Sequence, residues 1–250
     1  MFLMKKVFLK NSRGLKLAAD FYQSKSKSAI ILSHGFLGDR HEWGKFDKTA
    51  EVLNNAGYNV VTFDFSGCGE SDDAKITLAK QVEDLRSVIS SLRNSGITEI
   101  GMLGLSNGAL VSLLAYDENI KSIVLWNPST TSKSPDRILE RKEIIEARDW
   151  GYSAITIPNA RRQRVLVDSQ FLVEKQRVNQ KTLLERINCP VLIIQGEKDE
   201  VNPVNEAKSA ITYLKKSKLE IIPGEGHDLK LSLDRVISFT LDWFRFHLIK

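Results

Sequence analysis

The chain has 250 residues, of which 42% are hydrophobic, so it can bury a full core without needing more than one domain. Lysine and arginine outnumber aspartate and glutamate by 36 to 31, but the two signs are interspersed along the chain. The densest basic cluster, residues 161–164, is too short to indicate a nucleic-acid partner, and we interpret it as a solvated turn. No stretch approaches the ~18 apolar residues of a membrane span.

The cellular setting follows from the N-terminal segment and the cysteines. Charges within residues 1–10 stand where a signal peptide has its apolar segment. Cys68 and Cys189 lie far apart and lack a C-x-x-C spacing, which is typical of free thiols in a reducing compartment. We therefore expect a cytoplasmic protein with no membrane span. The composition leaves a homodimer open.

Short apolar segments alternate with helical ones along most of the chain. Residues 5–10 and 15–22 have the alternation of an antiparallel hairpin at one edge of a sheet. Further strands are expected at residues 29–33, 58–64, 100–105, 122–126, 191–195 and 219–222. Amphipathic helices are expected at residues 77–94 and from residue 233 to residue 244. Because apolar strands joined by crossover helices form parallel sheets, the sequence predicts an α/β fold with a mostly parallel central sheet and helices on both faces.

The alternation stops between residues 126 and 191, which is far longer than an ordinary connection. We expect a single domain, residues 1–250, with a small cap inserted at about residues 128–187. Within the cap, residues 134–148 predict a helix, residues 153–157 and 163–167 a hairpin, and residues 178–187 a further helix.

A serine lies between the strand expected at residues 100–105 and the apolar segment that follows it. Gly104-Leu105-Ser106-Asn107-Gly108 has the G-x-S-x-G pattern of a sharp strand-to-helix turn that exposes a nucleophilic hydroxyl. The alternative is a serine that only caps a helix. The strand before it and the helix after it favour the nucleophile.

A serine nucleophile needs a base, and the base needs a carboxylate that orients it. His227 follows the last expected strand in a glycine-rich loop, whereas His41 and His247 are better explained as structural or solvated. Catalytic groups of parallel sheets gather at the carboxyl ends of strands, and Asp199 lies in the loop after residues 191–195. Glu197 and Glu200 compete for this role, but the loop turns near Asp199. The expected catalytic residues therefore follow the order Ser106, Asp199, His227.

The oxyanion formed in acyl transfer needs backbone N–H donors. Residues 33–38 form a glycine-containing loop at a strand end, from which Phe36 can direct its N–H toward Ser106 beside the N–H of Asn107. We expect His34 to stabilise this loop without transferring a proton. Phe36 and Trp126 are candidates for lining an acyl pocket, although aromatic residues at strand ends commonly belong to the core.

Five segments together resemble the α/β-hydrolase family, from about residue 15 to the C-terminus. They are GLSNG at 104–108, HGFLG at 34–38, DFSGCGESD at 64–72, GEKD at 196–199 and GEGH at 224–227. The resemblance implies an α/β-hydrolase fold with Ser106 as nucleophile, Asp199 as acid and His227 as base, and with Phe36 and Asn107 as oxyanion-hole donors. The chain looks most similar to small carboxylesterases of the cinnamoyl or feruloyl esterase type. Ala109 departs from the family pattern, in which a second glycine is common.

The first functional hypothesis is a serine carboxylesterase that acts on a small-molecule ester through an acyl-enzyme, without a cofactor or metal. A thioesterase or an acyl-peptide hydrolase would use the same three residues. A hypothesis from another class is a non-catalytic binding module on the same fold.

Overall fold

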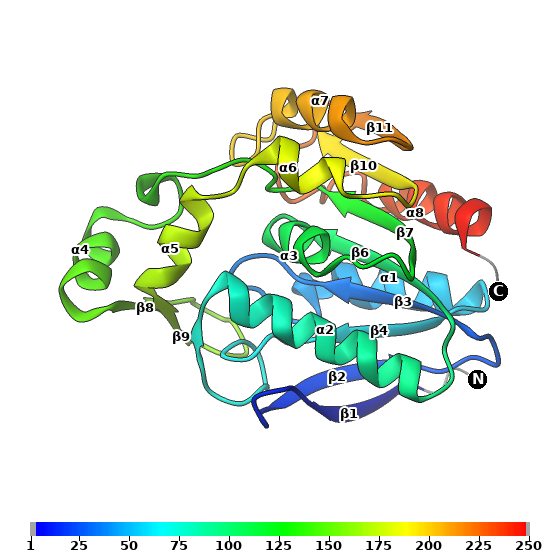
Figure 1. The fold of residues 1–250 in the computed structure, drawn as a ribbon, viewed down its shortest axis with the longest axis horizontal. Helices are drawn as coiled ribbons and strands as arrows, with labels where there is room; N and C mark the ends of the chain where they lie inside the picture. Colours follow the sequence, from blue (N-terminus) through cyan, green and yellow to red (C-terminus); the bar gives the residue numbers. More distant parts are fainter. Residues whose placement is uncertain (1–3, 249–250) are drawn as a thin grey trace.

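The computed structural model describes residues 4–248. Residues 1–3, which begin the segment in which no signal peptide is expected, lie outside the described residues, as do residues 249–250. The central sheet has eight strands in the order β1-β2-β4-β3-β6-β7-β10-β11 (Figure 1). These strands are β1 (Met4–Lys10), β2 (Lys16–Tyr22), β3 (Ser28–Ser33), β4 (Asn59–Phe63), β6 (Glu99–Leu105), β7 (Ile120–Trp126), β10 (Val191–Gly196) and β11 (Ser217–Ile222).

β2 is the strand that runs against the others. It pairs antiparallel with both β1 and β4, whereas the remaining pairings of this sheet are parallel. The carboxyl ends of β3, β6, β7 and β10 therefore meet at one edge of the sheet, where the loops that follow them can approach one another. The predicted α/β fold with a mostly parallel sheet is confirmed.

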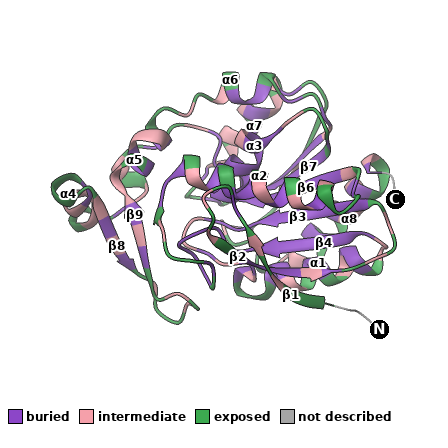
Figure 2. Cartoon of the chain, turned by 60° about the horizontal axis from the view of Figure 1, so that its bottom comes forward, coloured by how far each residue is buried: buried purple, intermediate pink, exposed green. Residues whose placement is uncertain are grey.

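Helices cover both faces of the sheet. The first face packs against α1 (Lys45–Asn55) and α8 (Leu233–His247), which bury Phe46, Leu53, Val236 and Phe244. The second face packs against α2 (Leu78–Asn94), α3 (Asn107–Ala115) and α7 (Val204–Tyr213). Figure 2 shows the strands between these layers largely buried. The expected helix at residues 77–94 is α2, with Thr77 as its N-cap accepting from the backbone N–H of Lys80.

Residues 128–187 are called the insert below. Most of their elements lie at the left of Figure 1, whereas their last helix, α6, lies beside the sheet. They contain a 3₁₀ turn at Pro135–Arg137, α4 (Arg141–Trp150), β8 (Tyr152–Thr156), β9 (Arg164–Asp168), α5 (Ser169–Gln176) and α6 (Gln180–Glu185). The expected hairpin corresponds to β8 and β9, which pair antiparallel. A two-residue strand, β5 (Lys75–Ile76), pairs parallel with β9 and so ties the insert to the main body of the chain.

One expectation for the insert was wrong, and one helix was missed. The single helix predicted at residues 134–148 is broken, because Glu140 is extended and forms a capping box with Glu143 that starts α4 afresh. Helix α5 was not predicted at all. It begins where the Asp168 side chain accepts from the backbone N–H of Gln170, and it follows β9 without a loop between them.

The cysteines and helices also bear on the expected setting. Cys68 and Cys189 are both free and buried, and burial raises the pKa of the Cys189 thiol to about 12. None of the helices within residues 4–248 has the length and apolar character needed to cross a membrane.

Candidate active site

Ser106 lies between β6 and α3 with φ 53° and ψ −112°, a strained conformation for a residue with a side chain. Its backbone N–H donates to the carbonyl of Trp126 at 2.9 Å, which fixes the turn to β7. The glycines on either side are required by close approach. A Cβ at Gly108 would overlap the Ser33 carbonyl, and one at Gly104 would lie 2.5 Å from the Cα of Ala109. Ala109 itself is fully buried, so the helix packs closely despite the departure from the family pattern.

The three expected catalytic residues are brought together. The Nε2 atom of His227 lies 3.0 Å from Ser106 Oγ, and its Nδ1 atom lies 2.9 Å from Asp199 Oδ2. With the ring proton on Nδ1, His227 donates to Asp199 and accepts from the serine hydroxyl. This is the arrangement in which an imidazole can remove the serine proton while a carboxylate holds its tautomer.

The Asp199 carboxylate is fixed from all sides. Its side chain is fully buried, and Oδ1 accepts from the backbone N–H groups of Val201 and Asn202, both at 2.9 Å. Gln195 donates from Nε2 to Oδ2 at 3.1 Å. Glu197, one of the two competing carboxylates, instead accepts from the backbone of Gly224. The loop therefore directs Asp199, and not Glu197, at the imidazole.

Asn127 holds the histidine loop against the end of β10, and sequence reasoning missed it. Its Nδ2 donates to the carbonyls of Gly226 and His227 at 3.1 and 2.7 Å, while its Oδ1 accepts from the backbone N–H of Gly196 at 2.7 Å. Its own carbonyl accepts from Asn202. Asn127 is fully buried with φ 42°. It directly follows β7, so its place at a strand end was a signal that could have identified it.

Phe36 and Asn107, the expected oxyanion donors, line one cavity together with Ser106. Neither of their backbone N–H groups donates a hydrogen bond within residues 4–248, so both are free to receive an anion. His34 is buried beneath this loop. Its Nε2 accepts from the backbone N–H of Phe65 and its Nδ1 donates to the Gly35 carbonyl, which agrees with the expected loop-stabilising role.

Glu42 also shapes the oxyanion loop and was not anticipated. Its buried carboxylate accepts from the backbone N–H of Gly35, and burial raises the pKa of this carboxyl. The segment around it is strained, because Leu37, Glu42 and Trp43 all have φ between 46° and 61°. The hydrogen bond between Gly35 and Glu42, at opposite ends of this segment, thus holds the loop in an unusual conformation.

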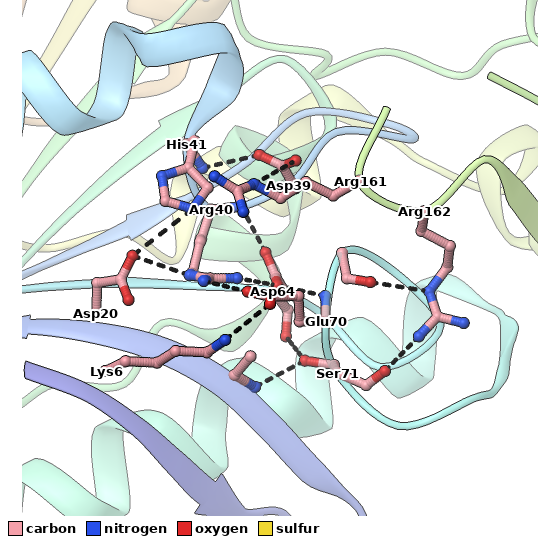
Figure 3. Close-up of polar contacts among 12 residues, drawn as sticks. Lys6, Asp20, Asp39, Arg40, His41, Asp64, Glu70, Ser71, Arg161 and Arg162 are labelled. Carbon is pink, nitrogen blue, oxygen red and sulfur yellow. Dashed lines mark hydrogen bonds and ion pairs between the residues drawn. The ribbon is translucent and has the colours of Figure 1, made fainter. Parts of the chain in front are cut away.

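Arg40 anchors the far end of this loop in a group of carboxylates (Figure 3). Its buried guanidinium pairs with Asp20 at 2.9 Å, with Asp64 at 2.6 Å and with Glu70. Lys6 and Arg40, both bonded to Glu70, lower the pKa of that carboxyl to about 2. The loop that carries Phe36 is therefore braced on both sides, by Glu42 and by this cluster.

The basic cluster at residues 161–164 is not simply a solvated turn. Arg162 donates to the carbonyls of Gly69 and Ser71 (Figure 3). It also pairs with Asp73. These bonds attach the turn between β8 and β9 to the loop that follows β4. Arg162 therefore links the insert to the loop braced by Arg40.

The cavity beside Ser106 has a volume of about 140 Å³. Its walls include Phe36 and Phe171, whose rings stack at 5.0 Å with an angle of 16° between their planes. Lys175, from α5, also reaches this cavity. Trp126 does not line it, since this side chain is fully buried on the α8 side and donates to Thr240. The expectation that Trp126 could line the acyl pocket was wrong.

Within residues 4–248, the ligand atoms of Asp20, His41 and Asp47 lie close enough together to hold a metal ion. These side chains already pair with one another or with Arg40. Asp20 accepts from Arg40, and His41 Nδ1 lies 2.7 Å from Asp47, which raises the pKa of the His41 imidazole. We interpret the group as an ion-pair cluster of the Arg40 region and derive no chemistry from it.

Comparison with known proteins identifies the family. A family model described as the alpha/beta hydrolase fold matches residues 28–166, more than half of the chain. The chain belongs to this family. The α/β hydrolase is 26% identical over 225 residues to the mouse (Mus musculus) serine hydrolase BPHL, an alignment that covers 81% of the chain and 74% of that protein.

Two solved structures show the same fold as this α/β hydrolase. The alpha/beta hydrolase GrgF from Penicillium sp. sh18 superposes with a TM-score of 0.83 at 18% identity, covering 98% of the chain and 99% of GrgF. Est1E from Butyrivibrio proteoclasticus, in a structure with ferulic acid bound, gives 0.76 at 23% identity, covering 96% and 99%. The family, the serine hydrolase relative and these neighbours together support a hydrolase of the α/β fold.

Proposed function

We propose that this α/β hydrolase is a serine carboxylesterase that cleaves small-molecule esters through an acyl-enzyme. The observation that carries the proposal is the unbroken series of hydrogen bonds from Ser106 through His227 to Asp199, at 3.0 and 2.9 Å. The series ends at Ser106, which lines the same cavity as Phe36 and Asn107.

In the proposed reaction, Ser106 Oγ attacks the ester carbonyl while its proton passes to His227 Nε2. The N–H groups of Phe36 and Asn107 donate hydrogen bonds to the resulting oxyanion, which stabilises the transition state by a few kcal/mol. Collapse of the tetrahedral intermediate breaks the C–O bond, and the imidazolium returns its proton to the leaving alcohol. Water, deprotonated by His227, then attacks the acyl-enzyme and releases the acid and the serine.

A fluorophosphonate probe tests the nucleophile. We expect covalent labelling of the wild type and of Ser90→Ala, which changes an exposed serine of α2, but none of Ser106→Ala. Ser106→Ala should also lower kcat for a p-nitrophenyl ester by at least about 1,000-fold. A folded wild type that neither reacts with the probe nor hydrolyses any ester would refute the enzyme and favour a binding module.

A substrate panel separates the esterase from the thioesterase and the acyl-peptide hydrolase, which would use the same three residues. Matched acyl groups carried on an alcohol, a thiol and an amine should be cleaved with the highest kcat/KM for the oxygen ester. A thioester or amide preference of tenfold or more would replace the esterase assignment.

Two broader expectations stay proposals. We propose one domain with a cap inserted at residues 128–187, supported by the pairing of β5 with β9 and by the bonds of Arg162. We also propose a cytoplasmic location, which the free, buried cysteines support.

A further inference from the structure

Lys175 is a buried cation beside the proposed nucleophile. It is 4% exposed, and it reaches the cavity of Ser106 from α5 of the insert. Its Nζ donates to Ser129 Oγ at 2.8 Å, and the backbone N–H of Ser129 in turn donates to the Ser106 carbonyl at 3.2 Å. One residue thus separates the ammonium group from the nucleophile's own backbone.

No carboxylate within residues 4–248 forms an ion pair with Lys175. Glu206 is the carboxylate within residues 4–248 whose charge acts on Lys175, and it already pairs with Lys133 at 2.6 Å. Burial, with a smaller contribution from Lys133, lowers the pKa of Lys175 to about 7. A buried ammonium with one hydrogen bond out of three is costly, so its presence at a reactive cavity calls for a functional explanation.

The rest of the cavity restricts what can meet this cation. Phe36, Ile138 and Phe171 provide apolar walls that suit methylene groups. Lys175 suits an anion, and two other basic side chains line the same cavity: Arg137, and Lys133, which pairs with Glu206. A volume of about 140 Å³ is close to the ~150 Å³ of a cavity that holds a benzene molecule, so the occupant has on the order of six non-hydrogen atoms.

The position of His227 indicates which part of the ester the cavity can hold. His227 must reach the leaving oxygen to protonate it, so the alcohol departs on the imidazole side. The residues that line the cavity include both proposed oxyanion donors, and His227 is not among those of the described part of the chain. The cavity therefore suits the acyl group and not the alcohol.

We propose that the preferred substrates are esters of short dicarboxylic acids, whose free carboxylate binds Lys175 while the esterified carbonyl lies at Ser106. This inference rests on the proposed esterase function and adds the substrate class and a specificity-determining residue to it. The substrate carboxylate forms the ion pair with Lys175 that no carboxylate of the described residues forms. Ser129 helps to hold the ammonium in place.

The test compares monoethyl glutarate with ethyl valerate, which have acyl chains of the same length with and without a terminal carboxylate. Ethanol release gives kcat/KM for each at pH 6.5. We expect the wild type to favour monoethyl glutarate, and we expect Lys175→Met to lower the ratio of the two kcat/KM values at least about tenfold, equivalent to about 1.4 kcal/mol. Lys175→Arg should retain more of the preference than Lys175→Met, because it keeps the charge.

Lys181→Met is the matched control, because Lys181 is an exposed lysine of α6 outside the cavity. It should leave the ratio within about twofold. A wild type that hydrolyses ethyl valerate as well as monoethyl glutarate would overturn the inference and leave the esterase function intact. If neither ester nor any other is cleaved, the proposed function itself fails.

Two further measurements cover other outcomes. Should Lys175→Met fail to fold, product inhibition of the wild type replaces it: glutarate should inhibit at a concentration at least about tenfold lower than valerate, and equal inhibition would contradict the inference. Acetoxyacetate carries its carboxylate in the alcohol part instead, and ethyl acetate is its neutral counterpart. A preference for acetoxyacetate that exceeds the preference for monoethyl glutarate would overturn the assignment of the cavity to the acyl group.

Discussion

Replacing Asn127 with glycine removes three side-chain hydrogen bonds and leaves the backbone free to keep its φ of 42°. At about 1 kcal/mol net for each bond, the expected loss of stability is about 3 kcal/mol. For a chain of this size it corresponds to a fall in Tm of roughly 6–12 °C. Since these bonds join the loop of His227 to the end of β10, we also expect kcat to fall about 10- to 100-fold, with KM changed less than threefold.

Asn159→Gly is the control for this substitution. Asn159 also has positive φ, at 61°, but it is exposed in the turn between β8 and β9 and its side chain makes no hydrogen bond with the described residues. Asn127→Asp adds a directional test. It retains the acceptor for Gly196 but sets a carboxylate against the carbonyls of Gly226 and His227, so it should lower kcat more than Asn127→Gly does. The reasoning is refuted if Asn127→Gly lowers Tm as expected while kcat stays within threefold of the wild type.

Three other substitutions test separate parts of the structure. Gly108→Ala should destabilise by about 3 kcal/mol in thermal unfolding, because its Cβ meets the backbone of Ser33; Gly226→Ala, whose Cβ has its nearest neighbour at 4.0 Å, should shift Tm by less than about 2 °C. Burial lowers the pKa of Lys175 from its ordinary 10.5 to about 7, so the cost of burying its charge is present in full below pH 7 and disappears as the pH rises toward 10.5. Lys175→Met should therefore stabilise the protein by about 1–4 kcal/mol at pH 6 and by less at pH 9.5, and an equal effect at both would contradict burial of the charge. Arg162→Ala should speed amide hydrogen exchange of residues 159–165 while leaving β6 and β7 unchanged, and equal rates in both variants would show that its bonds to Gly69 and Ser71 do not hold the turn.

The sequence was sufficient for the parts of the site that depend on local geometry. The glycines around Ser106 mark a turn in which a Cβ would collide with neighbouring backbone. Asp199 follows the buried strand β10, and His227 follows β11 at the edge of the sheet. Parallel strands carry such loops to one edge, so their convergence follows from the fold class. The same rule applied to the residue after β7 would have identified Asn127, since it too is polar and directly follows an apolar strand.

Contacts that depend on tertiary packing had no such signal. Glu42 accepts from the backbone N–H of Gly35, seven residues earlier. This contact accompanies positive φ angles at Leu37, Glu42 and Trp43, which the intrinsic propensity of these residues does not favour. Lys175 lies in Ser169–Gln176, where the sequence SQFLVEKQ does not distinguish a lysine that faces a cavity from one that faces solvent. The two-residue strand β5 is shorter than any periodicity can reveal.

The cavity beside Ser106 is lined by residues from two parts of the chain, the loops at strand ends and the insert. Ser106, Asn107 and Phe36 come from loops at the ends of β3 and β6, whereas Phe171 and Lys175 come from the insert. The first group lies at the carboxyl ends of parallel strands, where the proposed reacting atoms meet, and Glu42 and Arg40 brace the loop that carries Phe36. The second depends on α5, which begins directly after β9 and so takes its position from the pairing of β9 with β5 and from the bonds of Arg162. A change at this attachment should therefore alter the preference between charged and neutral acyl groups before it alters the reaction of Ser106 itself.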